Sequence, residues 1–169
     1  CERDASYRKS WDFYTKHRHT ERSALGTGRR NLGEDPFMVG NMGAAMIHGF
    51  QQGDFTGTQK VIACAKHLIG GGESINGLNA APADISVRTL REVHLPPYKK
   101  AIDAGLYSIM AAHNEINGVP SHMSKWLMTD ILRNEWNFKG FYVSDWLDIE
   151  RIDKLHHVAQ DMKEASFLS

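Results

Sequence analysis

Three short apolar runs separated by helix-like segments constrain the fold of this chain more than any other sequence feature. The runs cover residues 61–65, 106–112 and 141–143. They are apolar throughout instead of alternating with polar residues, as is typical of strands buried on both faces of a parallel sheet. Helices packed on the sheet would provide that cover. The sequence therefore predicts an α/β protein built from repeated strand–helix units.

Helix signals fill the spaces around these runs. Asp35 followed by Pro36 is typical of an N-cap and a first helical position, and Ser86 and Ser124 can cap two further helices. Pro96-Pro97 should break the second helix, because proline has no amide hydrogen and clashes with the preceding turn. The helices predicted in this way cover residues 36–50, 86–95, 98–104 and 124–136, with a last one near 158–165.

The alternation of strands and helices fits two architectures, part of a (β/α)8 (TIM) barrel with parallel strands or a doubly wound sheet. We assign residues 31–169 to this α/β domain and residues 1–30, which show no clear period, to an irregular N-terminal segment. Three strands cannot close a barrel of eight and would leave strand edges open. We therefore expect the chain to be a fragment that other barrel segments complete.

The charge balance argues against several classes of function. Lys and Arg total 20 and Asp and Glu total 20, so the formal net charge is zero. A nucleic-acid binder usually has a basic excess, and a membrane-surface binder needs a cationic face. No apolar run approaches the roughly 20 residues that span a bilayer. The sequence starts at Cys1 and not at Met, so export stays open, and the sequence leaves the oligomeric state open, a homo-oligomer included.

Each apolar run stops at side chains that can do chemistry. Lys66-His67, His113-Asn114 and Asp145-Trp146 follow the three runs in turn. The carboxyl ends of parallel strands meet at one edge, where active sites of such folds lie. A carboxylate, a lysine, imidazoles and an indole together suit a sugar, whose hydroxyls need polar partners and whose apolar face needs a ring. Taken singly, each residue fits a helix cap, a solvated charge or a structural histidine equally well, so their common position carries the prediction.

The sequence shows no signature of a metal or cofactor site. It has no His-Glu-x-x-His motif and no Cys/His spacing typical of zinc. Its triple glycine, Gly70-Gly71-Gly72, lacks the Gly-Lys-Ser/Thr ending of a phosphate-binding loop. His156-His157 is expected at the surface. We predict neither a metal nor an organic cofactor.

Four ordered motifs resemble family 3 glycoside hydrolases over about residues 28–165. The motifs are Gly33-Glu34-Asp35-Pro36 and the segments 61–70, 109–120 and 138–146. This resemblance implies part of the family's N-terminal TIM-barrel domain. It also implies that a second, downstream domain, which normally provides the general acid/base, is absent from this chain. The sequences of the motifs look most like those of bacterial β-glucosidases, so a periplasmic or secreted location is favoured.

The resemblance also implies roles for individual residues. Asp145 corresponds to the family's nucleophile, Lys66 and His67 to the pair that binds sugar hydroxyls, and Trp146 to a residue lining the site. Many members carry a tyrosine where His113 stands beside the nucleophile. Arg29 lies near the place of a sugar-binding arginine, but without the tryptophan of the family's Trp-Gly-Arg motif.

The function implied is retaining hydrolysis of terminal, non-reducing β-D-glucosyl residues from a small-molecule or oligosaccharide β-glycoside. Asp145 would form a covalent glycosyl-enzyme, and a separate carboxylic acid would protonate the leaving oxygen. The alternatives are a β-xylosidase of the same family and a fragment that binds sugar without catalysis. A doubly wound nucleotide-binding module remains a third reading, although the glycine fingerprint of such modules is missing.

Overall fold

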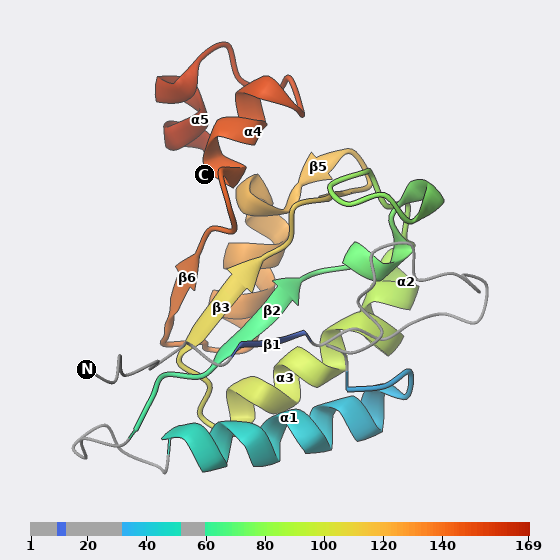
Figure 1. The fold of residues 1–169 in the computed structure, drawn as a ribbon, viewed down its shortest axis with the longest axis vertical. Helices are drawn as coiled ribbons and strands as arrows, with labels where there is room; N and C mark the ends of the chain where they lie inside the picture. The colour runs from blue at the N-terminus through green and yellow to red at the C-terminus, as the bar shows by residue number, and fades with distance from the viewer. Residues whose placement is uncertain (1–9, 13–31, 52–59) are drawn as a thin grey trace, which may run out of the picture.

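A parallel sheet forms the centre of the computed structural model, which describes residues 10–12, 32–51 and 60–169 (Figure 1). Within these residues its four strands lie in the order β1-β2-β3-β6, and every adjacent pair is parallel. This arrangement confirms the predicted parallel sheet. The strands are β1 (Ser10–Asp12), β2 (Cys64–Leu68), β3 (Ser108–Ala111) and β6 (Phe141–Val143).

Strand β1 lies in the segment that was predicted to be irregular. It pairs with β2 through the register Ser10 to Cys64 and Asp12 to Lys66. With only three residues, β1 is too short to show a hydrophobic period, so the sequence pattern could not reveal it. Its place at the edge of the sheet comes from pairing with β2, which is a tertiary contact.

Helices and one small hairpin make up most of the remaining described structure. The antiparallel hairpin consists of β4 (Glu115–Ile116) and β5 (Val119–Pro120). Short 3-10 turns are η2 (Gly71–Glu73), η3 (Ile75–Gly77) and η5 (Ser121–Met123). The longer helical elements are α1 (Pro36–Gln51), α2 (Val87–Thr89), π-helical η4 (Leu90–His94), α3 (Leu95–Asp103), π-helical η6 (Trp126–Glu135), α4 (Asp148–Lys154) and α5 (Met162–Leu168).

The capping side chains confirm where three of the helices begin. Asp35 Oδ1 accepts a hydrogen bond from Met38 N at 2.8 Å, and Ser86 Oγ accepts one from Thr89 N at 3.0 Å. Ser124 Oγ is 3.3 Å from Leu127 N. Each bond satisfies an amide that the first turn of a helix leaves free. Short polar side chains before apolar segments were therefore reliable markers of helix starts.

The predicted break at Pro96-Pro97 is wrong. The chain stays helical from Val87 to Asp103, passing from α2 through the π-helical segment η4 into α3. Leu95 N donates to Leu90 O, the wider hydrogen-bond spacing of a π turn. The two prolines occupy the first turn of α3, directly after the π turn, and the helix continues through them although neither has an amide hydrogen to donate. The π turn thus accommodates the rings that would distort a regular α-helix.

Strand β2 begins three residues later than the apolar run predicted. Val61 N donates to Phe50 O at 3.1 Å, and Ala63 N donates to the Gln51 side chain at 3.2 Å. These bonds tie the start of the run to the end of α1 instead of to a neighbouring strand. As a result, Lys66 and His67 lie inside β2, near its carboxyl end, and do not follow it.

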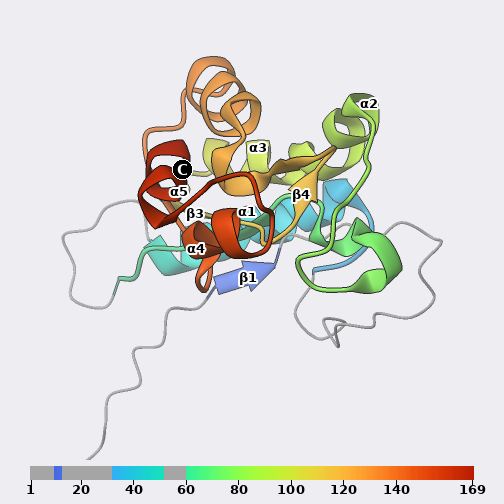
Figure 2. The same cartoon turned by 90° about the horizontal axis from the view of Figure 1, so that it is seen from above.

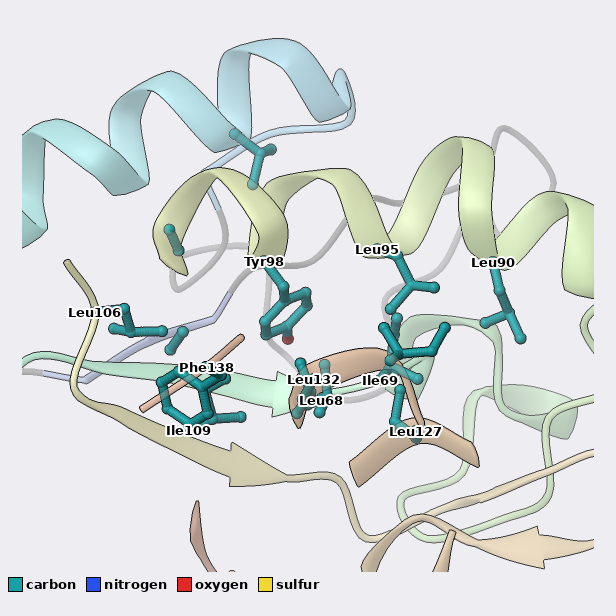
Figure 3. Packing of buried hydrophobic residues seen from close by; sticks show 14 of the residues in the cluster. Leu68, Ile69, Leu90, Leu95, Tyr98, Leu106, Ile109, Leu127, Leu132 and Phe138 are labelled. Atoms are coloured by element: carbon teal, nitrogen blue, oxygen red, sulfur yellow. The ribbon is translucent and has the colours of Figure 1, made fainter. Parts of the chain in front are cut away.

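Side chains from α3, η6 and the sheet form the main hydrophobic core (Figure 3). Tyr98 and Leu95 of α3 point toward Leu68 of β2 and Ile109 of β3, and all four are almost fully buried. The helix η6 contributes the buried side chains of Leu127, Ile131 and Leu132 to the same core. The core fixes β2 and β3 side by side, so it also fixes the residues at their carboxyl ends.

A second, smaller cluster joins the two C-terminal helices. Ile152 of α4 packs with Ala159 and with Ala165 of α5. Both helices lie beyond the carboxyl end of β6, and in the perpendicular view they lie over the end of the sheet (Figure 1 and Figure 2). The helix predicted near 158–165 is present but begins later, as α5, where Asp161 accepts from Glu164 N at 2.8 Å. Helix α4 was not predicted, because seven residues are too short to show a period.

Candidate active site

The carboxylate of Asp145 lies where three strands of the sheet converge. Asp145 follows β6 by two residues, and its Oδ2 atom is 3.0 Å from His67 Nε2 of β2. The same oxygen is 3.1 Å from Nε2 of His113, which follows β3. The two imidazole rings lie 21° from parallel with their centroids 6.2 Å apart. The structure therefore brings together three predicted site residues that are far apart in the sequence.

The second oxygen of Asp145 is held by the backbone. Trp146 N donates to Asp145 Oδ1 at 2.6 Å. Burial raises the pKa of Asp145, but this hydrogen bond and the charges of His113, His67 and Lys66 outweigh it. The pKa of Asp145 therefore lies below its ordinary value. The group is accordingly an ionised carboxylate at neutral pH, as a nucleophile must be.

This lowered pKa predicts a pH-dependent effect of Asp145→Asn on stability. A carboxyl group whose pKa is depressed by folding stabilises the protein above its unfolded-state pKa, and that contribution is lost as the pH falls through the folded-state pKa. We expect Asp145→Asn to lower the urea midpoint of the chain more at pH 6 than at pH 3. Urea unfolding at both pH values, followed by circular dichroism, measures this. An equal effect at the two pH values would contradict the assignment of the lowered pKa.

The remaining predicted residues have different surroundings. Lys66 is half-buried in β2, and its charge contributes to lowering the pKa of Asp145. Trp146 directly follows Asp145 in the sequence. The residue is 74% exposed, so its indole is available to solvent. Arg29 lies outside the described residues.

A buried carboxylate that the sequence analysis missed lies behind His113. The Asp148 side chain is 2% exposed, and its Oδ1 atom is 2.5 Å from His113 Nδ1. Arg151 Nη1 is 3.2 Å from the same oxygen and 2.6 Å from His113 Nδ1. Asp148 and Arg151 are three residues apart in α4, a spacing that places them on one face of the helix, but nothing in the sequence showed that this face meets His113.

His156 is another correction to the sequence analysis, which placed it at the surface. Its side chain is 5% exposed, and its Nδ1 atom is 2.7 Å from Glu115 Oε1 in β4. His157 is exposed, as expected. The Glu115–His156 pair connects the loop after β3 to the segment between α4 and α5. The contact of Asp148 in α4 with His113 and the contact of His156 with Glu115 both lead back to the segment after β3.

Within the described part of the chain, no group of three or more His, Cys, Asp or Glu side chains is arranged to hold a metal ion. None of the helices described is long and apolar enough to cross a membrane. The groups present at the site are the Asp145 carboxylate, the imidazoles of His67 and His113 and the Trp146 backbone amide.

Comparison with known proteins identifies a family. The model of the glycosyl hydrolase family 3 N terminal domain matches residues 19–167. A β-xylosidase from Formosa agariphila is 44% identical over 149 residues, which cover 85% of this chain and 20% of that protein. This chain therefore spans about a fifth of the length of that relative.

Solved structures agree with the sequence comparison. A β-glucosidase from Erythrobacter marinus matches with a TM-score of 0.84 and 36% identity, over 93% of this chain and 20% of that one. The β-glucosidase of Listeria innocua in complex with glucose matches with a TM-score of 0.81 and 34% identity, over 95% of this chain and 22% of that one. The parallel sheet with its helices is thus part of a (β/α)8 barrel.

Proposed function

This chain belongs to the N-terminal domain of glycosyl hydrolase family 3, and from that premise we propose that it supplies the nucleophile to a retaining β-glucosidase of carbohydrate catabolism. The substrate would be a terminal, non-reducing β-D-glucosyl residue of a small glycoside or oligosaccharide. One observation carries the proposal: the ionised Asp145 carboxylate, at the carboxyl end of β6, faces His67 of β2 and His113, which follows β3. Glycoside hydrolysis itself is supported by the β-xylosidase and β-glucosidase relatives.

In the proposed reaction the Asp145 carboxylate attacks the anomeric carbon of the sugar. The glycosidic C–O bond breaks, and its oxygen leaves with a proton from a carboxylic acid outside this chain. Water, deprotonated by the same acid's conjugate base, then attacks the anomeric carbon and releases Asp145 as a carboxylate. The sugar product therefore keeps its β configuration after two displacements.

The other site residues would bind the sugar. Lys66 and His67 are proposed to contact hydroxyl groups, and His113 to support the nucleophile through Nε2. Trp146, whose indole is exposed beside the carboxylate, would stack on the apolar face of the sugar. Arg29 is a further proposed hydroxyl ligand. The remaining barrel strands and the acid/base would come from polypeptide beyond these 169 residues.

A β-xylosidase activity is the alternative substrate preference. The Formosa agariphila protein that matches at 44% identity is a β-xylosidase, whereas the solved structures described above are β-glucosidases. Glucose and xylose differ by the hydroxymethyl group at C5, so the preference depends on residues that surround this group. A fragment that binds sugar without turning it over is the non-catalytic alternative for the isolated chain.

Covalent labelling tests this proposal. We define a carrier enzyme as the Listeria innocua β-glucosidase in which residues 32–168 of this chain replace the aligned segment. A 2-deoxy-2-fluoro-β-glucosyl donor with a dinitrophenolate leaving group needs no acid catalyst and should trap the glycosyl-enzyme. We expect intact mass to show one sugar per carrier enzyme, and peptide mapping to place it on Asp145.

The labelling experiment has two controls and a clear negative outcome. The Asp145→Asn carrier should take up no label, and the matching 2-fluoroxylosyl donor shows which sugar is preferred. A sugar attached to a residue other than Asp145, or a folded carrier that is neither labelled nor active, would overturn the proposal.

A further inference from the structure

We propose that Asp148 is a positioning residue, which holds His113 so that its Nε2–H is directed at the Asp145 carboxylate. The inference deepens the proposed function and rests on it for its kinetic consequence. The position of the His113 proton, however, can be measured whether or not the protein is a glycosidase. Asp148 lies at the start of α4, three residues after Asp145, and faces the opposite side of the His113 ring.

The burial of Asp148 shows that its carboxylate is part of a built network. Its side chain is 2% exposed, and a buried carboxylate is costly unless charged or hydrogen-bonding groups surround it. Two groups do so at Oδ1, His113 Nδ1 at 2.5 Å and Arg151 Nη1 at 3.2 Å, whereas His122 Nε2 lies 3.4 Å from Oδ2 and neither of these two buried atoms makes a hydrogen bond. Burial lowers the pKa of His122, so this ring is neutral at pH 7. The charge of Asp148 is therefore balanced by Arg151 and by the proton it shares with His113.

The donors and acceptors around His113 require a hydrogen on Nε2, the ring nitrogen that faces Asp145. Asp148 Oδ1 and Asp145 Oδ2 are both acceptors when ionised, so each contact needs a hydrogen. A neutral ring with its proton on Nδ1 would place the Nε2 lone pair 3.1 Å from the Asp145 oxygen, an unfavourable arrangement. If the shared proton lies on Nδ1 the ring is an imidazolium, and if it lies on Asp148 the ring is the Nε2–H tautomer. In both states Nε2 keeps a hydrogen for Asp145.

Arg151 strengthens this arrangement from the same helix. Its Nη1 atom is 2.6 Å from His113 Nδ1 and 3.2 Å from Asp148 Oδ1. As a permanent donor it can bond the carboxylate or an unprotonated Nδ1, but it cannot accept a proton from the ring. Around Asp145 itself the other charged or titratable neighbours are His67 and Lys66 of β2. None of these groups supplies the acceptor that Asp148 supplies to Nδ1.

The effect of Asp148 on catalysis follows from the contacts of the two ring nitrogens of His113. A ring fixed at Nδ1 by a buried carboxylate can donate from Nε2 along one direction only, toward Asp145 Oδ2. This donation keeps the nucleophile ionised and oriented before attack, and Asp148 itself never touches the sugar. His113 stands where many family members carry a tyrosine, whose hydroxyl needs no such partner to fix a tautomer. The Asp148 carboxylate would therefore be the group that allows a histidine to support the nucleophile at this position.

Nitrogen-15 NMR of the histidines in the 169-residue chain tests the proton position. At pH 7 the unmutated chain should show a protonated Nε2 at His113. Asp148→Asn should shift the His113 Nδ1 resonance, because an amide does not share a proton with Nδ1 as the carboxylate does, whereas Nε2 can keep its hydrogen for Asp145. Glu150→Gln is the matched control, since it removes one negative charge from an exposed position of the same helix and should leave the signal unchanged. The His156 resonance, which reports the Glu115 contact, shows whether the segment is still docked.

The kinetic arm uses the carrier enzyme and an aryl β-glucoside. Asp148→Asn should lower kcat by about 10²-fold with KM changed less than about threefold, because a ring that Asp148 no longer holds supports the reacting carboxylate less well, whereas sugar binding is unaffected. Glu150→Gln should leave both constants unchanged. A purely structural role would instead lower the amount of folded enzyme and leave the kcat of the folded fraction intact.

The outcomes separate this inference from the proposed function. An unmutated chain whose His113 Nε2 carries no proton at pH 7 overturns the inference by itself, even if Asp148→Asn fails to fold. An Asp148→Asn variant that keeps both the unmutated His113 Nδ1 resonance and the full kcat also overturns it. If Asp145→Asn proves harmless in the carrier while Asp148→Asn still shifts the His113 Nδ1 resonance, the proposed function fails and the positioning of His113 by Asp148 stands.

Discussion

Asp145→Asn is expected to lower kcat of the carrier enzyme on an aryl β-glucoside by at least about 10⁴-fold, the scale at which loss of a nucleophile is usually felt. The amide cannot form the glycosyl-enzyme, yet it nearly preserves the shape of the carboxylate. Its oxygen can still accept the bond from Trp146 N, which is 2.6 Å from Oδ1 in the unmutated chain. The loss should therefore reflect chemistry and not a collapsed site. Steady-state kinetics with a chromogenic leaving group measure it.

Chemical rescue sharpens this prediction. Formate or azide can enter the space next to an amide and attack the anomeric carbon in place of the carboxylate, so either anion should restore part of the lost rate. The Glu150→Gln carrier, with its exposed change on α4, should keep the kcat of the unmutated carrier. A near-normal rate for Asp145→Asn without added anion would exclude Asp145 as the nucleophile.

Gly140→Ala is expected to destabilise the chain by roughly 3 kcal/mol or more, above the usual range for overpacking. A Cβ atom at Gly140 would lie 2.1 Å from the backbone oxygen of Tyr107 and 2.6 Å from the Phe138 ring. The Tyr107 oxygen also accepts the bond from Phe141 N at 3.0 Å, which starts the pairing of β6 with β3. Because backbone and not a flexible side chain is in the way, β6 must move. Urea unfolding followed by circular dichroism measures the loss.

Gly49→Ala is the matched control for this substitution. Gly49 lies inside α1, and a Cβ atom there would meet nothing within 4 Å. Alanine is favoured over glycine in a helix interior by about 0.5–1 kcal/mol, so this variant should be as stable as the unmutated chain or slightly more so. If both variants unfold at the same urea concentration, the close approach of Gly140 to Tyr107 is not a constraint on the fold. A displaced β6 would also move Asp145, two residues after the strand.

Local sequence signals predicted several features of the fold correctly. Asp35, Ser86 and Ser124 marked helix starts because a cap acts within three residues of itself. The local signals gave a wrong prediction where the sequence is compatible with two backbone hydrogen-bonding patterns. The prolines at 96 and 97 were expected to end a helix, whereas the π turn that accepts them depends on α3 packing its buried face on the sheet.

The sequence by itself determined that polar side chains end three apolar runs, and therefore that His67, His113 and Asp145 meet at one edge of a parallel sheet. This follows because all strands of such a sheet point the same way, whatever their order. Only the tertiary structure decided which atoms meet, since contacts such as the one between Asp148 and His113 join residues 35 positions apart. The seven-residue helix α4 is too short for its hydrophobic period to predict which face is buried. The packing of Ile152 against Ala165 orients the helix so that Asp148 faces inward.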